Sequence, residues 1–308
     1  MEVKDRILYS SKEYINRVEN VLDQFNGFRY DRKYKQLLGE HFTTMLSSWN
    51  QTIRERKNDA FTIVVVGDFK RGKSSFINAL LGQEVVTTNV TTETVTLNTI
   101  SYGEQSNKAS LAGGRCIQLT DGELCRSQLE EIIKQAGEPI TELEIKRPIE
   151  LLKDIHIVDT PGTSDTLHNF DEKVAEHLLQ ADAVIYLCSV NYPLSLSEQL
   201  FIKTVILPQK YTEVFLIGNF ADILGDKKSY LRMEEFLNER VKNLLPHKKC
   251  LLVSALDEIC RIEGKERPCP KLEGYLEGNF DQFRESLVKI VNDKKETVIP
   301  DRMQRLLL

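Results

Sequence analysis

A chain of 308 residues is long enough to bury a sizeable hydrophobic core, and its content of 41% apolar and 28% charged residues excludes long disorder. The net charge of −5 argues against a nucleic-acid partner, because nucleic-acid binding needs a basic surface. No segment approaches the ~20 apolar residues that a membrane-spanning helix needs, and no secretory signal opens the sequence. We therefore expect a cytoplasmic protein with free cysteines, whose membrane contact, if it has one, is peripheral and on the inner face of a membrane.

Residues 1–57 are predicted to form an N-terminal helical segment. Apolar residues recur at helical spacing before and after a polar break at Asn26 and Gly27. The pattern indicates two amphipathic helices whose apolar stripes need a partner.

The pattern changes at residue 58, where short apolar runs begin to alternate with helical segments. We expect strands at residues 61–66, 95–102, 155–158, 183–188, 214–217 and 250–253, and helices at 73–81, 127–136, 171–179, 195–206, 230–245 and 256–262. This alternation is typical of an α/β fold in which helices flank a mostly parallel sheet. We assign residues 58–265 to this domain.

Two regions depart from that alternation. Residues 103–147 hold paired turn glycines and an alternating run at 140–145, which predicts an inserted hairpin or an extra pair of strands. Residues 266–308 begin with a proline-rich turn and end in a helix from about residue 280, which Pro300 is expected to kink. We expect this C-terminal helix to return to the N-terminal helices.

The strongest chemical signal is a phosphate-binding loop directly after the first strand. Gly67, Gly72, Lys73 and Ser74 match the pattern Gly-x4-Gly-Lys-Ser, and a helix that includes Ser75 follows. The glycines let backbone N–H groups point at phosphate oxygens, and the helix N-terminus adds a positive partial charge. Lys73 is expected to reach the β- and γ-phosphates and the Ser74 hydroxyl to bind Mg²⁺, so the domain is predicted to have the P-loop NTPase fold.

A second motif, Asp159-Thr160-Pro161-Gly162, follows the predicted strand at 155–158. Asp159 is placed to hold Mg²⁺ through water, and the Gly162 N–H to contact the γ-phosphate. Switch GTPases carry such a loop ~90 residues after the phosphate loop, whereas helicase-type ATPases favour an acidic pair there.

Base recognition is predicted where the apolar run 214–217 ends, at Asn219 and Asp222. The Asp222 carboxylate accepts from guanine N1 and the exocyclic amine, and adenine offers no such pair of donors. GTPases usually carry Lys where this chain has Phe220, whose ring covers the base but makes no hydrogen bond; a degenerate base site is the alternative. Ser254 and Ala255 match the short loop whose backbone N–H meets guanine O6.

The threonine that closes over Mg²⁺ and the γ-phosphate is expected within residues 87–94. Among several threonines there, Thr94 is the first choice and Thr92 the second, because the segment leads into the strand at 95–102. A merely solvated threonine is the alternative at each position.

Taken together, these motifs resemble the dynamin-like large GTPases, most closely their bacterial members, with mitofusins as more distant relatives. The resemblance covers about residues 61–265 and rests on residues 66–82, the threonine-rich segment and residues 147–152. It implies binding of GTP or GDP with Mg²⁺, GTP hydrolysis stimulated by head-to-head dimerisation, and coupling of that cycle to membrane binding or remodelling. It also implies that the flanking helices form a neck bundle.

One departure from the family pattern concerns the end of the chain. Relatives carry a long helical trunk with a membrane-contacting tip after the GTPase domain, and the residues after 265 are too few for one. Either the chain is a truncated one, or a second dynamin-like chain supplies the missing half.

Hydrolysis needs charge neutralisation and an oriented water more than covalent chemistry. Thr163 stands where small switch GTPases carry Gln, and Phe69 cannot orient water by hydrogen bonding. Our hypothesis is that Lys70 or Arg71, repositioned when two heads meet, neutralises transition-state charge; the alternative is that both are solvated loop cations. The predicted catalytic residues are Lys73, Thr94, Lys70 and Arg71, and the loop residues that contact nucleotide are Gly67, Phe69, Lys70, Arg71, Gly72, Lys73, Ser74 and Ser75.

Two other functions share these motifs. A switch GTPase of ribosome or RNA assembly would use the same nucleotide site, although the acidic charge and the lack of an added basic domain argue against it. A guanine-nucleotide-binding module that does not hydrolyse GTP is the other alternative, suggested by Thr163, Phe69 and Phe220.

Overall fold

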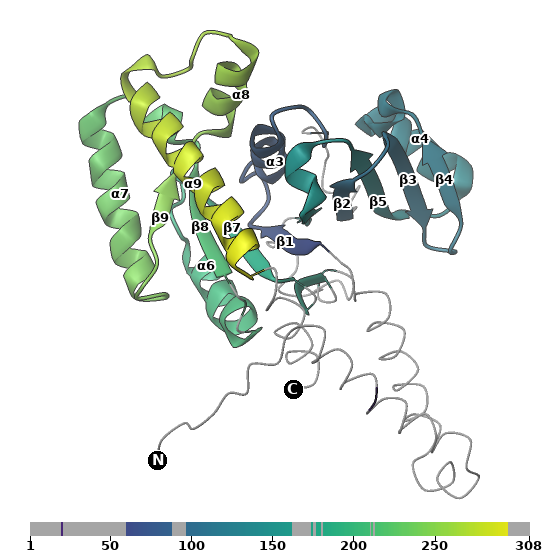
Figure 1. Ribbon diagram of the computed structural model, residues 1–308, viewed down its shortest axis with the longest axis horizontal. Coiled ribbons are helices and arrows are strands. Elements are labelled where there is room, and N and C mark those ends of the chain that lie inside the picture. The colour runs from purple at the N-terminus through teal and green to yellow at the C-terminus, as the bar shows by residue number, and fades with distance from the viewer. Residues whose placement is uncertain are drawn as a thin grey trace, which may run out of the picture. The chain divides into compact units, whose positions relative to one another are not determined.

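The computed structural model describes residue 20 and residues 60–87, 97–161, 174, 177–179, 181–209, 211 and 213–294. The chain divides into two compact units, one of Met1–Ala60 with Asn292–Leu308 and one of Phe61–Val291. The second unit holds almost all of the described residues (Figure 1). Apart from residue 20, the predicted N-terminal helices lie outside the described residues, as does the chain after residue 294.

Within the described residues of the second unit, nine strands form one sheet in the order β4-β3-β5-β2-β6-β1-β7-β8-β9. The strands are β1 (Phe61–Val66), β2 (Leu97–Tyr102), β3 (Ser106–Leu111), β4 (Cys116–Leu119), β5 (Ile140–Arg147), β6 (Ile155–Asp159), β7 (Ala183–Ser189), β8 (Glu213–Asn219) and β9 (Cys250–Leu252). The α-helices are α3 (Lys73–Leu81), α4 (Arg126–Ala136), α6 (Leu196–Phe201), α7 (Lys227–Lys242), α8 (Ala255–Glu263) and α9 (Glu273–Lys294). None of these helices is both long and apolar enough to cross a membrane.

Strands β6, β1, β7, β8 and β9 run parallel, which confirms the predicted α/β fold with a mostly parallel sheet. Every residue of β1 is buried, as expected for a central strand covered on both faces. Because the strands are parallel, their carboxyl ends meet at one edge of the sheet. That edge brings together the segments that follow β1, β6 and β8, which are the segments with the predicted chemistry.

The other half of the sheet contains the predicted insertion. Strand β2 is antiparallel to β6 and parallel to β5, and β3 pairs antiparallel with both β5 and β4. Gly114, with φ 81°, provides the left-handed turn that joins β3 to β4. The structure therefore confirms the hairpin expected within residues 103–147, and Figure 1 shows α4 alongside these strands.

Helix α9 packs against the parallel half of the sheet through aromatic side chains. The rings of Phe280 and Phe283 each lie 5.5 Å from the ring of Phe76 in α3, and Phe283 also lies 5.2 Å from Phe215 in β8. Burying a side chain of this size contributes about 2 kcal/mol. Residues up to Val291 therefore belong to the unit of the sheet, whereas the sequence pattern places residues 266–308 in a separate C-terminal segment.

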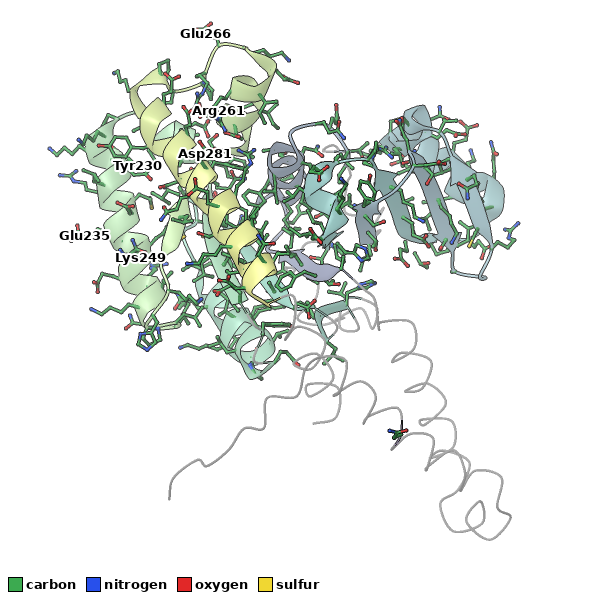
Figure 2. The ribbon with its side chains drawn as sticks, viewed as in Figure 1. Tyr230, Glu235, Lys249, Arg261, Glu266 and Asp281 are labelled. Atoms are coloured by element: carbon green, nitrogen blue, oxygen red, sulfur yellow. The ribbon has the colours of Figure 1, made fainter. Side chains whose placement is uncertain are left out.

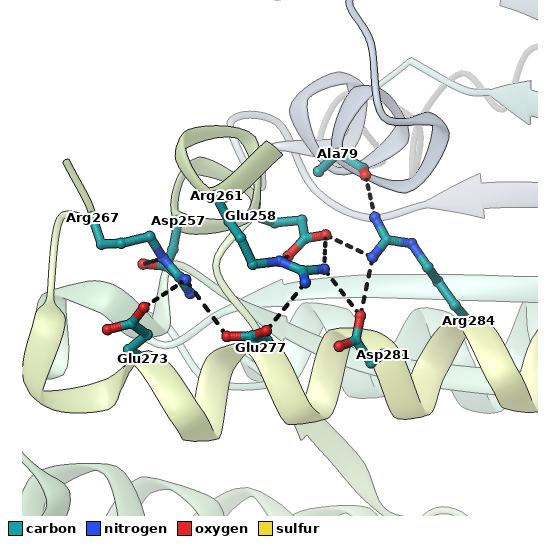
Figure 3. A network of polar contacts seen from close by, with 9 residues as sticks. All are labelled: Ala79, Asp257, Glu258, Arg261, Arg267, Glu273, Glu277, Asp281 and Arg284. Carbon is teal, nitrogen blue, oxygen red and sulfur yellow. Dashed lines mark hydrogen bonds and ion pairs between the residues drawn. The ribbon is translucent and has the colours of Figure 1, made fainter. Parts of the chain in front are cut away.

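A network of ion pairs, which we call the α8–α9 clamp, fastens α9 in place (Figure 3). Arg261 of α8 pairs with Asp281 of α9 at 3.0 Å, and Figure 2 shows these two side chains close together. Arg284 of α9 donates to the carbonyl oxygen of Ala79 in α3 at 2.8 Å. The clamp consists of Asp257, Glu258, Arg261, Arg267, Glu273, Glu277, Asp281 and Arg284.

Candidate nucleotide-binding site

The loop between β1 and α3 is shaped by two glycines at which a Cβ would collide with neighbouring atoms. A Cβ on Gly67 would lie 2.3 Å from the carbonyl oxygen of Leu187, inside the neighbouring strand. Gly72 has φ 78°, and a Cβ there would lie 2.5 Å from Nδ2 of Asn219. The backbone of the loop therefore lies directly against β7 and the end of β8, and α3 begins at Lys73 with Gly72 as its N-cap.

Lys73 folds back over this loop. Its Nζ donates to the carbonyl oxygens of Gly67 at 2.9 Å and Asp68 at 3.2 Å. Burial lowers the pKa of Lys73, against the opposing effect of the carboxylates of Asp159 and Asp68. The ammonium is thus held against the backbone of the loop that the sequence predicts to bind phosphate oxygens.

Asp159, at the end of β6, meets Ser74 beside the loop. The Ser74 hydroxyl donates to Oδ2 of Asp159 at 2.8 Å, and Nδ2 of Asn98 lies 3.4 Å from the same oxygen. Burial raises the pKa of Asp159 despite the nearby Lys73. Its other oxygen, Oδ1, is buried and has no hydrogen-bond partner among the described residues. A hydroxyl beside a carboxylate with a spare oxygen is a donor set that suits Mg²⁺, so these residues fit the predicted ion.

Asn219 joins the phosphate loop to the base-reading end of the site. This fully buried side chain donates from Nδ2 to the carbonyl oxygen of Arg71 at 3.0 Å. Its Oδ1 accepts the backbone N–H of Ala255 at 3.1 Å. The Ser254 hydroxyl, next to it, accepts from the N–H of Asp257 at 3.0 Å and so caps α8. The contact of this short loop with guanine O6 stays a prediction.

The turn that the sequence predicts to read the base carries Phe220 and Asp222. Phe220 has the left-handed φ of 68°, and its ring lies against Gly72, whose added Cβ would be 3.1 Å from it. The aromatic ring thus lies at the loop, at the position where GTPases usually have Lys. Oδ1 of Asp222 is buried and, within the described part of the chain, makes no hydrogen bond. The N1–H and amine of guanine fit this acceptor.

The two loop cations lie in different environments. Arg71 donates from Nε to Oε1 of Glu198 at 2.9 Å, so its guanidinium is held by α6. Lys70 has the left-handed φ of 59°, is exposed, and has its Nζ 5.4 Å from the centre of the Phe69 ring. The sequence treats these two residues alike, and the structure separates them.

Three site residues were missed from sequence. Asn98 lies beside Asp159, Glu198 holds Arg71, and Oδ1 of Asn78 in α3 accepts the N–H groups of Val85 and Val86 at 2.9 Å each. Asn78 and Asn98 are buried polar residues within apolar segments, which is a readable signal. Glu198 lies three residues after Ser195, so the sequence pattern explains it as a helix-capping residue. Nothing in that pattern indicates its second contact, which is with Arg71.

Part of the predicted switch region cannot be placed. Gly162, Thr163, Thr92 and Thr94 lie outside the described residues. Their roles at the γ-phosphate and the metal stay predictions. The other predicted site residues, from Gly67 through Ser75 with Asp159, Asn219, Asp222, Ser254 and Ala255, lie at or next to the carboxyl-end edge of the parallel strands.

A glycine loop between the strand β1 and the helix α3, with a buried carboxylate beside it at the end of the parallel strand β6, defines a P-loop nucleotide-binding protein. A protein-family profile described as the dynamin family matches residues 63–220, more than half of the chain. The chain belongs to the dynamin family.

Individual relatives agree with this assignment. The chain is 29% identical over 199 residues to a probable transmembrane GTPase, FZO-like and chloroplastic, of Arabidopsis thaliana, covering 64% of the chain and 19% of that protein. It is 27% identical over 217 residues to a bacterial dynamin-like protein of Nostoc punctiforme, covering 67% and 30%. A solved structure of an oligomerised bacterial dynamin pair, described as sensing and tethering membranes over long range, aligns with a TM-score of 0.62 at 21% identity, covering 96% of this chain and 46% of that one. The chain thus spans less than half the length of these three proteins.

Proposed function

We propose that this chain binds GTP with Mg²⁺ and hydrolyses it to GDP and phosphate. The observation that carries the proposal is the buried, unpartnered Oδ1 of Asp222 at the base-reading turn. Leaving a buried acceptor unsatisfied costs about 1–3 kcal/mol, and guanine offers the donors that would recover it. Adenine has no donor pair in that position, so the same carboxylate selects against ATP.

In the hydrolysis that we propose, the chain contributes mainly charge and position. Mg²⁺, when bound, neutralises charge on the phosphates, and Ser74 and Asp159 are the residues that would hold it. Lys73 stabilises negative charge from within the loop. We assign the additional cation to Lys70, because the Arg71 guanidinium is already bound to Glu198.

Nucleotide binding is the direct test. Titrating the chain with fluorescent GDP, GTP and ATP analogues, each with Mg²⁺ and with a chelator, is expected to show binding of the guanine nucleotides only, and tighter binding of GTP with the metal. Phosphate release above the background without enzyme supports hydrolysis, and binding without turnover would leave the non-hydrolysing module. Equal affinity for ATP would contradict the guanine assignment.

We further propose that the heads, meaning the unit Phe61–Val291, self-associate around the nucleotide. Large apolar side chains are exposed next to the phosphate loop: Tyr192 is 65% exposed, Leu196 84% and Leu200 51%. Arg71 of the loop lies 5.6 Å from the centre of the Tyr192 ring, which connects this patch to the site. Exposed aromatic and aliphatic anchors of this kind are typical of protein interfaces.

The segment that presents Tyr192 is held rigidly. Leu194 has the unusual φ of 50° and is fully buried. Arg240 of α7 donates to the carbonyl oxygens of Pro193 at 2.6 Å and Leu194 at 2.8 Å. A pre-ordered surface loses little entropy on binding, which favours an interface.

Size-exclusion chromatography of the full chain tests this pairing. With a GTP analogue or GDP–metal fluoride we expect a dimer, and with GDP a monomer. Leu196→Glu should abolish the dimer, whereas Leu231→Glu, at a less exposed leucine of α7 (44%), should not. A dimer that survives Leu196→Glu would place the interface elsewhere.

The membrane role is the most distant part of the proposal. It rests on family membership and on the fold shared with the membrane-tethering bacterial dynamin pair, which also suggests a second dynamin-like chain as partner. We propose a cytoplasmic protein that binds the inner face of a membrane peripherally. Co-sedimentation with anionic vesicles, with and without GTP, is the test; GTP-dependent RNA binding instead would favour a switch GTPase of RNA assembly.

A further inference from the structure

Glu198 is a buried carboxylate beside the phosphate loop that the proposed hydrolysis does not use. Its side chain is 0% exposed, although it lies in the first turn of α6. Oε1 accepts from Nε of Arg71 at 2.9 Å, and Oε2 accepts from the backbone N–H of Ser195 at 2.7 Å. Both oxygens therefore have a partner, and one of these partners belongs to the loop.

Arg71 is held at its side chain and at its backbone. The guanidinium, besides its bond to Glu198, lies 3.5 Å from Oδ2 of Asp68 and over the Tyr192 ring. The carbonyl oxygen of Arg71 accepts from Asn219. With only 14% of its side chain exposed, Arg71 does not have the surroundings of a solvated loop cation.

The neighbours of Arg71 show why the loop needs holding. Lys70 and Gly72, on either side of it, both have left-handed backbone conformations, with φ 59° and 78°. Such a conformation is strained for a residue with a side chain and persists only when its surroundings impose it. Arg71 lies between these two residues, so its hydrogen bond to Glu198 of α6 helps to impose the left-handed conformations on the loop.

We infer that Glu198 is a positioning residue which, through Arg71, holds the phosphate loop in its receptive shape before the nucleotide arrives. This inference rests on the proposed nucleotide site. It assigns Arg71 to the architecture of the loop and leaves Lys70 as the cation available to the transition state.

The energetics of Glu198 agree with a functional rather than a stabilising role. Burial raises its pKa in spite of the opposing effects of Arg71 and the Ser195 N–H. A buried ion pair is often no more stabilising than well-packed hydrophobic residues of similar volume. Burial thus disfavours the charged form of Glu198, while its bond to Arg71 acts on the conformation of the loop.

The decisive variant is Glu198→Gln, which keeps the shape and the contact with Ser195 but removes the charge. We expect the Kd for GDP and for a GTP analogue to rise by on the order of tenfold each, because a hydrogen bond to a charged group is lost. At saturating GTP, kcat should stay within about twofold. Without nucleotide, the amides of residues 67–73 should exchange hydrogen faster while the melting temperature is not lowered, a combination that a merely structural role does not produce.

Tyr186→Phe is the matched control. Tyr186 is fully buried near the same loop, and its hydroxyl has no hydrogen-bond partner among the described residues. Burial raises the pKa of Tyr186, and the next largest cause of this increase is the charge of Glu198, so the hydroxyl lies close to Glu198. Removing this hydroxyl should leave both affinities unchanged.

Several results would overturn the inference. An unchanged Kd in Glu198→Gln would do so, and so would a higher kcat at unchanged Kd, which would mean that Glu198 stores Arg71 away from the phosphates. If Glu198→Gln does not fold, Arg71→Ala carries the same expectation and the same test; where both fold, the double variant should bind no more weakly than either single one. If the wild-type chain binds no nucleotide, the proposed function fails, and the exchange of residues 67–73 still decides whether Glu198 holds the loop.

Discussion

The nucleotide site and the α8–α9 clamp are both built from buried carboxylates and basic side chains, yet the hydrogen bonding of their carboxylates differs. In the clamp, Asp257 and Glu258 are each about 1% exposed and are paired with arginines, Asp257 with Arg267 and Glu258 with Arg261 and Arg284. In the site, Asp159 and Asp222 each keep one buried oxygen that bonds to none of the described residues.

The difference shows which region is complete without a ligand. Buried polar groups in folded proteins are nearly always hydrogen-bonded, and each exception calls for an explanation. The clamp has no such exception at its two buried carboxylates, so its role is to hold helices. The exceptions at Asp159 and Asp222 support the positions that we propose for the metal and the base.

The largest expected effect lies in the site. Lys73→Ala should weaken GTP binding on the order of 1,000-fold, because a buried ammonium beside the phosphates is lost. Lys153→Ala, which removes an exposed lysine paired with Glu150, should bind GTP like the wild type. Titration with a fluorescent GTP analogue measures the affinity of both variants. If Lys73→Ala lowers the affinity less than tenfold, the site is not built around bound phosphates.

The clamp should respond in stability instead. Arg267→Ala leaves Asp257 buried without its arginine, so the free energy of unfolding should fall by about 3 kcal/mol. Urea denaturation followed by circular dichroism measures this loss. The neighbouring Lys265→Ala breaks an exposed ion pair with Glu263 and should not measurably change the free energy of unfolding. If both variants lower the free energy of unfolding equally, the buried pairs of the clamp contribute no more than an exposed pair.

Changing the base-reading carboxylate sharpens the comparison further. Asp222→Asn should shift the preference from guanosine to xanthosine diphosphate by roughly 30-fold, or about 2 kcal/mol. Xanthine has a carbonyl oxygen where guanine has its amine, and the amide of the introduced asparagine donates to it. Asp222→Ala, lacking donor and acceptor, should bind both weakly; if the asparagine variant still prefers guanosine, Asp222 does not read the base.

The smallest expected effect concerns pH and Glu198, the buried carboxylate of α6 that pairs with Arg71 of the loop. Since burial raises the pKa of Glu198 above its ordinary value of 4.5, its contribution to stability is full below that pH and is lost as the pH rises through the raised pKa. The stability of Glu198→Gln relative to the wild type should therefore increase as the pH rises above about 4.5. Urea denaturation at several pH values tests this, and a difference independent of pH would contradict it.

Much of the fold could be predicted because its signals are local. The helix predicted at residues 73–81 coincides with α3, since Gly72 and Gly82, both left-handed, mark its ends. The predicted helix at 195–206 is instead α6 followed by a π-helical turn, Ile202–Ile206, which no apolar periodicity distinguishes. Helix α9 begins at Glu273, earlier than the predicted residue 280, because its start packs on the sheet domain.

The site divides in the same way. Gly67, Gly72, Lys73 and Ser74 were predicted because the loop and its helix are consecutive in sequence, so spacing alone specifies their geometry. The different surroundings of Lys70 and Arg71 could not be predicted, because Glu198 lies 127 residues from Arg71 in the sequence. Only the packing of α6 against the loop decides which cation is held.

By itself, the sequence determined the class of this protein: alternating strands and helices, a phosphate loop, and acidic residues at two later strand ends. These features depend on backbone conformation and on the alternation of strands and helices along the chain, which short-range patterns encode. The tertiary structure alone decided which carboxylates are paired and which keep a buried, unbonded oxygen. That outcome depends on strand register and helix packing between residues more than 100 positions apart, as with Arg71, Asn219 and Glu198.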